Sequence, residues 1–225
     1  MNRTASIAIA AAAAAAALGA APAGAASVSF TGFQTGSTAV SIASPNGLTA
    51  AAGEFRGTVD ANAFTSYCIE LGQSISVPGG PYADYVLRPL SADSRFGSTQ
   101  VDLLDRLYTN YLADSRLDAQ RSAGFQLAVW EITYDPTPNG VHSGNFRIDP
   151  EASQTAGGLA AIGYAQTYLT DLGAKRASGY VFEELYSPTR QDQLLAKVPL
   201  PGSLALAFVG AAGWFGVRRG TRRDA

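Results

Sequence analysis

The sequence predicts a single α+β domain, an antiparallel β-sheet or sandwich into which a bundle of about three helices is inserted. Three observations lead to this class. Short runs of alternating apolar residues, separated by turn residues, fill the first third of the chain. Apolar residues at three- and four-residue spacing follow in the middle, and alternating runs return near the end. Strands, then helices, then strands are typical of one α+β domain.

Five strands are expected in the first third. They cover residues 27–30, 38–43, 53–59, 64–75 and 82–90. Turn-forming segments rich in proline, glycine and asparagine separate them, most clearly residues 44–47 and 77–81. Successive side chains in a strand point to opposite faces, so each alternating run has one apolar face to bury. Short runs joined by turns of this kind indicate an antiparallel sheet.

The middle of the chain is predicted to be helical. Helices are expected over residues 99–113, 119–134 and 151–172, a loop over 135–150, and two returning strands over 180–186 and 192–198. Ser98 or Thr99 is a suitable N-cap for the first helix. The second helix is apolar almost all round, so it is predicted to be buried. The pairs Glu183/Glu184 and Asp102/Asp105 are interpreted as solvated charges.

The N-terminus has the features of a secretory signal peptide. A short basic lead precedes an apolar run of 12 residues at 7–18, and the small residues Ala23, Gly24 and Ala25 form a cleavage site. A membrane-spanning helix is the alternative, but such a helix requires about 20 apolar residues. The predicted division is a signal peptide at 1–25, a folded body at 26–197 and a C-terminal segment at 198–225.

The charge of the body limits its partners. Residues 26–201 contain 11 Lys and Arg against 17 Asp and Glu, without basic clusters. Phosphate contacts require concentrated Lys and Arg, so nucleic-acid binding is not expected. The sequence also lacks metal-ligand spacing, a P-loop and a dinucleotide fingerprint, so no metal and no cofactor are predicted.

The C-terminal segment combines three features in a fixed order. A Val-Pro-Leu-Pro sequence at 198–201 precedes an apolar stretch at 203–217, and arginines follow. Arginines after a short apolar stretch stay on the cytoplasmic side, as in a stop-transfer sequence. A plain single-pass anchor is one interpretation. The residues that carry the pattern are Val198, Pro199, Pro201, Arg218 and Arg219.

This arrangement resembles the PEP-CTERM sorting signal of Gram-negative exosortase substrates. That family usually has Val-Pro-Glu-Pro, whereas Leu200 stands in place of the glutamate here, and Asp224 and Ala225 extend past the arginines. The resemblance implies that an exosortase cleaves the tail and releases the body to the cell surface or extracellular matrix. Contact with the membrane is then expected only through this segment, before processing.

Cysteine usage is unusual for an exported protein. Cys68 is the single cysteine of the chain, so no intrachain disulfide can form. An inert buried thiol, an intermolecular disulfide and another covalent bond are the remaining outcomes. A Cys-dependent hydrolase would pair Cys68 with the single histidine, His142, oriented by Asp135 or Asn139. A lone histidine in a loop is more often simply solvated.

Two short segments stand out. Tyr67 and Cys68 lie in the predicted strand at 64–75, on opposite faces. Gln126 lies within an apolar helical run, where an unpartnered carboxamide costs on the order of 1–3 kcal/mol. Trp130 follows Gln126 by one helical turn on the same face. Gln126 therefore needs a specific partner in the folded protein.

The two segments resemble the paired signature of the Cys-Gln thioester (TQXA) domains of bacterial surface proteins. Tyr-Cys-Ile-Glu is followed, 58 positions after Cys68, by Gln126 within Phe-Gln-Leu-Ala-Val-Trp. Phe125 stands where that family often has Thr, and Glu70 where it has Asp or Asn. The resemblance implies that the sulfur of Cys68 is joined to the side-chain carbonyl of Gln126, with release of ammonia.

The function implied is covalent attachment rather than catalysis. A stored thioester must be protected from water, and Tyr67, Phe125 and Trp130 are the expected shields. An amine- or hydroxyl-bearing polymer or protein on a partner surface would attack the acyl group once, without turnover, so the chain is not expected to be an enzyme. The alternative is an inert matrix protein in which Cys68 is a small buried hydrophobe and Gln126 bonds to backbone.

Overall fold

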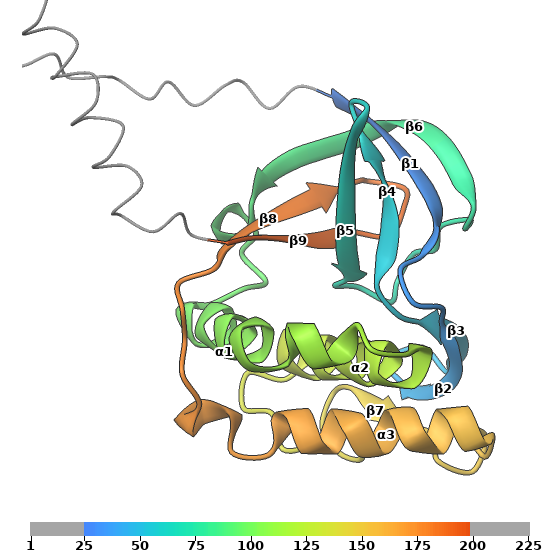
Figure 1. Ribbon diagram of the computed structural model, residues 1–225, viewed down its shortest axis with the longest axis vertical. Helices are drawn as coiled ribbons and strands as arrows, with labels where there is room; N and C mark the ends of the chain where they lie inside the picture. Colours follow the sequence, from blue (N-terminus) through green and yellow to red (C-terminus); the bar gives the residue numbers. More distant parts are fainter. Residues whose placement is uncertain (1–24, 199–225) are drawn as a thin grey trace, which may run out of the picture.

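The computed structural model describes residues 25–198 (Figure 1). The predicted signal peptide before Ala25 and the tail residues Pro199, Pro201, Arg218 and Arg219 lie outside the described residues. Within residues 25–198, no helix is both long enough and apolar enough to cross a bilayer.

Six antiparallel strands form the main sheet, which closes into a barrel. In spatial order they are β1 (Ala25–Phe33), β4 (Phe55–Val59), β5 (Asn62–Cys68), β9 (Gln193–Lys197), β8 (Val181–Tyr186) and β6 (Gly79–Pro89), and β6 pairs back onto β1. Alternation explains the interior, since Val28 and Phe30 of β1 are buried whereas Ser27 is exposed. The predicted α+β class, with an antiparallel sheet and three helices, is confirmed.

A second sheet has three strands, in the order β3 (Leu48–Ala52), β2 (Thr38–Ser44), β7 (Arg147–Ile148). Only β2 was expected from the sequence. Three of the five residues of β3 are alanine, so its alternation is faint. β7 is two residues long and lies in the predicted loop, where it pairs with β2 across a distance of about a hundred residues in sequence. Short strands held by remote partners leave little local pattern.

Three helices pack below the barrel in the view of Figure 1, with α2 (Ala119–Tyr134) between the barrel and α3 (Ala156–Leu169). α1 (Ser98–Ser115) packs beside α2, and single 3₁₀ turns occur at Leu90–Ala92 and Leu172–Ala174. Eleven consecutive residues of α2, from Ser122 to Ile132, are buried, which confirms its predicted burial. α2 is thus the helix that carries side chains into the core from both of its faces.

Gly124 allows α2 and α3 to approach closely. A Cβ at this position would lie 2.5 Å from the Cβ of Tyr164 and 2.9 Å from the carbonyl oxygen of Ala161. Neither atom belongs to a flexible side-chain end, so any larger residue would push the helices apart. Gly124 therefore sets the distance between α2 and α3.

Some predicted boundaries were wrong. The third helix begins at Ala156 rather than 151, because the Asp149 carboxylate accepts the N–H groups of Glu151 and Ala152 in a turn. The strand predicted over 64–75 ends at Cys68. The N-cap of α1 is Gly97, one residue before Ser98, and its N–H is accepted by the side chain of Gln100.

Two buried apolar clusters share the interior. One contains Cys68 and Trp130 and fills the barrel side, and the other contains Tyr67 and Phe125 and lies between α1, α2 and the barrel. Because Tyr67 and Cys68 are adjacent in β5, their side chains enter opposite clusters. The C-terminal end of β5 is therefore surrounded by core on both faces.

Candidate functional site

Cys68 and Gln126 lie in direct contact, although 58 positions separate them in the chain. The main-chain N–H of Cys68 donates to Oε1 of Gln126 at 2.9 Å, and Nε2 of Gln126 donates to the carbonyl oxygen of Cys68 at 2.8 Å. Both residues are 0% exposed. The carboxamide therefore has a partner for its donor and its acceptor in a place that excludes solvent.

The sheet explains why Cys68 needs such a partner. In an antiparallel strand, main-chain groups point alternately to the two neighbouring strands. Ile69 donates to Asp192 on the β9 side, so Cys68 faces the β4 side. Pairing with β4 ends at Phe55 opposite Ser66, which leaves the next outward-facing residue, Cys68, without a strand partner. The carboxamide of Gln126, carried by α2, takes that place.

The Cys68 thiol donates to the carbonyl oxygen of Glu70 at 2.7 Å, and Nε2 of Gln191 donates to the same oxygen at 3.1 Å. Burial raises the pKa of the Cys68 thiol far above its usual value, and the carboxylates of Glu70 and Asp192 raise it further. The sulfur is therefore a neutral thiol at neutral pH. Its attack on any acyl group requires a base to take the proton.

Trp130 borders the sulfur. Its indole N–H favours the thiolate and so opposes the rise in the Cys68 pKa. Among residues 25–198, the buried Nε1 of Trp130 has no hydrogen-bond partner. An unpaired buried donor is uncommon, since burying one costs about 1–3 kcal/mol. This N–H is free to stabilise a negative charge that develops on the sulfur.

The other two expected shields, Tyr67 and Phe125, lie in the second cluster. Their ring centroids are 4.6 Å apart, and Tyr108 packs edge-on against Phe125 at 5.1 Å. Tyr67 is also fixed by a 3.1 Å hydrogen bond between its hydroxyl and Ser115. Tyr67 and Phe125 are the chain neighbours of Cys68 and Gln126, but their rings lie in the cluster that does not contain Cys68. Trp130 is in the cluster of Cys68 itself.

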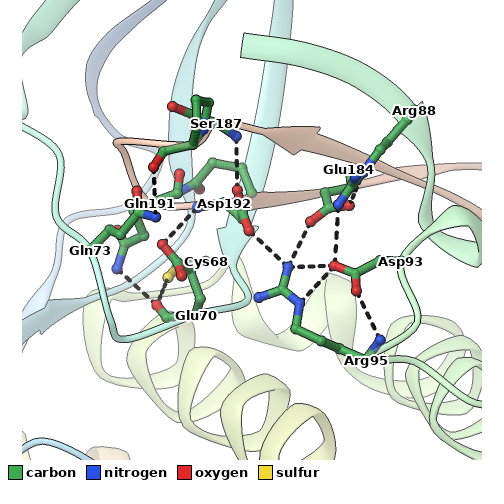
Figure 2. A network of polar contacts seen from close by, with 12 residues as sticks. Cys68, Glu70, Gln73, Arg88, Asp93, Arg95, Glu184, Ser187, Gln191 and Asp192 are labelled. Atoms are coloured by element: carbon green, nitrogen blue, oxygen red, sulfur yellow. Dashed lines mark hydrogen bonds and ion pairs between the residues drawn. The ribbon is translucent and has the colours of Figure 1, made fainter. Parts of the chain in front are cut away.

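An ion-pair network adjoins the Cys68–Glu70 segment (Figure 2). The guanidinium of Arg95 donates to Asp93 at 2.7 Å, to Glu184 at 2.8 Å and to Asp192 at 2.8 Å. Arg88 adds a 2.6 Å contact to Glu184. Three buried carboxylates are thus compensated by two arginines, as buried charges require.

Asp192 connects this network to the segment that follows Cys68. Its carboxylate accepts from Arg95 and from the N–H of Ser187, its N–H donates to the Glu70 carboxylate at 3.4 Å, and its carbonyl accepts from Ile69. Burial raises the pKa of Glu70, with a further contribution from Asp192. The network therefore fixes the backbone that positions the thiol and keeps a carboxylate of increased basicity beside it.

The interpretation of two acidic residues as solvated was wrong. Glu184 is 0% exposed within the Arg95 network, and Asp105 is buried and accepts the main-chain N–H groups of Gly179 and Tyr180. The burial of Glu184 could have been predicted from alternation in β8, because Glu184 shares a strand face with the apolar Phe182. Its arginine partners are remote in the chain and had no local signal.

The residues of the hydrolase alternative are not arranged as a catalytic group. His142 is exposed in the 135–150 loop, whereas Cys68 is fully buried. The Asp135 carboxylate accepts the N–H groups of Asn145 and Phe146, and the main chain of Asn139 donates to Glu131. Asp135 thus organises its own loop and is not engaged with His142.

Comparisons with protein-family models, with curated proteins and with solved structures found no match. Within residues 25–198, no group of three or more His, Cys, Asp or Glu side chains could hold a metal ion.

Proposed function

We propose that Cys68 and Gln126 form an internal thioester, by which the exported protein attaches covalently to nucleophiles on a partner surface. The observation that carries this proposal is the buried contact between the Gln126 carboxamide and the main chain of Cys68. An ordinary amide resists a thiol in water. Fixed orientation of the two groups supplies roughly 7–11 kcal/mol of such a barrier.

Formation of the thioester is balanced by the loss of one ammonia from the two side chains. The thiol leaves the Glu70 carbonyl and turns to the acyl carbon of Gln126, where an S–C bond forms and the C–N bond to Nε2 breaks. The nitrogen leaves as ammonia and carries away the thiol proton. The Glu70 carboxylate, whose pKa is raised by burial, is the nearby group that relays this proton.

The stored bond reacts once. A nucleophile attacks the acyl carbon of Gln126, the C–S bond breaks, and the proton of the nucleophile passes to the Cys68 sulfur. The Trp130 N–H beside the sulfur stabilises the leaving thiolate. The acyl group of Gln126 stays bonded to the partner, so the reaction does not turn over. Adhesion or anchoring is the function that follows.

Burial supports a long lifetime for such a bond. Cys68 and Gln126 are both fully buried, and Trp130 is 2% exposed. Hydrolysis requires water at the acyl carbon, and a closed apolar environment denies it. The expected signal peptide and exosortase-processed tail add a route to the cell surface or extracellular matrix of a Gram-negative bacterium.

The inert matrix protein is the second candidate, and the same contact favours it. The carboxamide of Gln126 satisfies both main-chain groups of Cys68, which is a sufficient structural reason for a buried glutamine. In that case Gln126 is a clamp between α2 and β5 and no bond forms.

Intact-mass measurement of the purified protein distinguishes the two. We expect a chain one ammonia lighter than its sequence, a Cys68 that resists alkylation, and an adduct with methylamine that releases the thiol. A chain of full mass with freely alkylated Cys68 in the unfolded protein would support the inert protein instead.

Matched variants test whether the ammonia is lost from Cys68 and Gln126. Ammonia loss should vanish in Cys68→Ala and in Gln126→Met, and persist in Gln193→Met, because Gln193 is a buried glutamine paired opposite Cys68 in β9. The sequences Asn46-Gly47 and Asn139-Gly140 can also lose ammonia as succinimides. A loss that survives Cys68→Ala therefore comes from elsewhere and refutes the thioester.

A further inference from the structure

A pocket of about 470 Å³ opens next to the Cys68–Gln126 site. It lies between β3, the loop that follows Leu71, the β8–β9 loop and α2, and Trp130 forms part of its wall. Its volume falls within the roughly 300–1,000 Å³ of small-molecule sites. Gln191 also lines it and bonds to the Glu70 carbonyl that accepts the thiol, so pocket and sulfur share walls.

Two buried polar atoms of residues that line the pocket have no hydrogen-bond partner among the described residues. They are Oε1 of Gln73, a hydrogen-bond acceptor, and Nε1 of Trp130, a donor. Figure 2 shows Gln73 and Gln191 together on one side of Glu70 and Cys68, with Arg95 on the other. A buried acceptor without a donor is costly, and Gln73, which is only partly buried, gains a hydrogen bond if its amide turns to meet an O–H or N–H of a ligand.

The pocket carries no charged side chain among its lining residues. Its polar groups are the amides of Gln73 and Gln191 and the hydroxyls of Thr49 and Ser74, and aromatic rings of Phe33, Phe55 and Trp130 supply apolar surface. A protonated amine or a carboxylate would lose its hydration there without a counter-ion. A neutral molecule with many hydroxyl groups and apolar ring faces matches both kinds of wall.

We propose that this pocket binds a neutral carbohydrate, and that a hydroxyl of the bound sugar is the nucleophile of the thioester. The second half of this inference rests on the proposed function; the binding half does not. The hydroxyl oxygen forms a bond to the acyl carbon of Gln126, the C–S bond breaks, and the hydroxyl proton passes to the sulfur of Cys68. The product is an ester between protein and sugar, and Trp130 is the side chain that turns to admit the hydroxyl.

Binding is tested in the full-length protein with Cys68→Ala, in which no thioester can form. Trp214→Phe is added so that Trp130 is the sole tryptophan, because the chain has two. Maltotriose, cellotriose and isomaltotriose are titrated against Trp130 fluorescence, with trigalacturonate and cadaverine as charged probes. At least one neutral trisaccharide should saturate the signal, at least tenfold more tightly than either charged probe.

A matched pair of variants locates the site. Gln73→Leu should weaken binding of the same trisaccharide by about tenfold, the value of one lost hydrogen bond. Gln34→Leu, an exposed glutamine outside the pocket, should leave binding unchanged. Failure of all three trisaccharides to saturate the signal, equal binding of cadaverine, or equal effects of the two variants would overturn the pocket assignment.

The attack of the sugar hydroxyl on the thioester is tested with the wild-type protein and the trisaccharide that binds. The mass expected is that of the thioester form plus one intact sugar, with a hydroxylamine-sensitive bond and a released Cys68 thiol. Ammonia loss without a sugar adduct would keep the thioester and reject the carbohydrate as its target. Binding without ammonia loss would keep the pocket and reject the thioester.

Discussion

Two polar assemblies border the segment from Cys68 to Glu70, and they satisfy buried groups in opposite ways. On the α2 side, the neutral carboxamide of Gln126 matches one donor and one acceptor of the main chain, fully enclosed. On the β6 and β8 side, Arg95 compensates three carboxylates while 42% of its own side chain is exposed. One assembly is dry and neutral, and the other is charged and open to solvent at its edge.

This difference in charge and solvent access favours the neutral assembly as the place for a thioester. Interior electrostatic interactions are strong in a dry site, and a neutral carboxamide can be buried there without a counter-ion. The charged assembly would be a poor place for a stored acyl bond, because water reaches its rim. It is suited to holding the backbone of Ile69 and Glu70, through Asp192, while the neutral assembly holds Cys68 and Gln126 together.

The largest expected effect is on the neutral assembly. Gln126→Leu, made in a Cys68→Ala background to exclude any thioester, leaves the N–H and C=O of residue 68 buried without partners. Each unsatisfied group costs about 1–3 kcal/mol, so we expect a loss of about 4 kcal/mol in the free energy of unfolding. Urea unfolding followed by tryptophan fluorescence measures it.

Gln126→Glu is the control for this prediction. A protonated carboxyl can still accept from residue 68 and donate to it, whereas a carboxylate cannot donate. The variant should be close to the parent at acidic pH and lose stability as the pH rises. A cost below about 1 kcal/mol for Gln126→Leu would mean that water replaces the carboxamide.

The second effect concerns the charged assembly. Arg95→Leu leaves Asp93 and Asp192 without their main cation, although Glu184 keeps Arg88. We expect a loss of about 3 kcal/mol, the lower end for a broken buried ion pair, because Arg95 is partly exposed. Lys197→Leu, which breaks an exposed pair with Glu183, should cost less than about 0.5 kcal/mol. Equal costs in urea unfolding would show that the Arg95 network is solvated.

The third effect concerns Glu131, a buried carboxylate outside both assemblies. Glu131 is 0% exposed and accepts the N–H groups of Asn139 and Gly140, and burial raises its pKa from 4.5 to about 7. The folded state therefore holds its proton more tightly than the unfolded state, and stability falls as the pH rises from about 4.5 to 7.

Glu131→Gln removes that titration. Relative to wild type, the variant should gain about 3 kcal/mol as the pH rises from about 4.5 to about 8, and then stay level. Urea unfolding at a series of pH values provides the measurement. A difference between the two proteins that stays constant over this interval would contradict the raised pKa.

The smallest effect is at the edge shared by the Cys68 site and the pocket. The N–H of Leu71 donates to the Tyr134 hydroxyl at 2.8 Å. Tyr134→Phe removes this bond where the surroundings are only partly buried, so we expect a loss of about 1 kcal/mol. Hydrogen exchange of the Leu71 amide should become about fivefold faster. An unchanged exchange rate would show that another group protects this amide.

The sequence predicted the elements with strong local periodicity. The burial of α2 and the order of strands, helices and strands could be predicted from apolar spacing alone. The strands β3 and β7 could not, because β3 ends in three alanines with no alternation and β7 exists only through pairing with β2. The third helix was predicted too long because the Asp149 turn competes with helix at its start.

For the site, the sequence selected Cys68 and Gln126 as a pair and established that a buried glutamine needs a partner. Only the tertiary structure decided that this partner is the main chain of Cys68, since that depends on where β4 stops pairing and on the packing of α2 against β5. Apolar periodicity is a local property of the chain. Hydrogen-bond partners and compensating charges, such as those of Glu184, belong to remote segments that meet only when the core has packed.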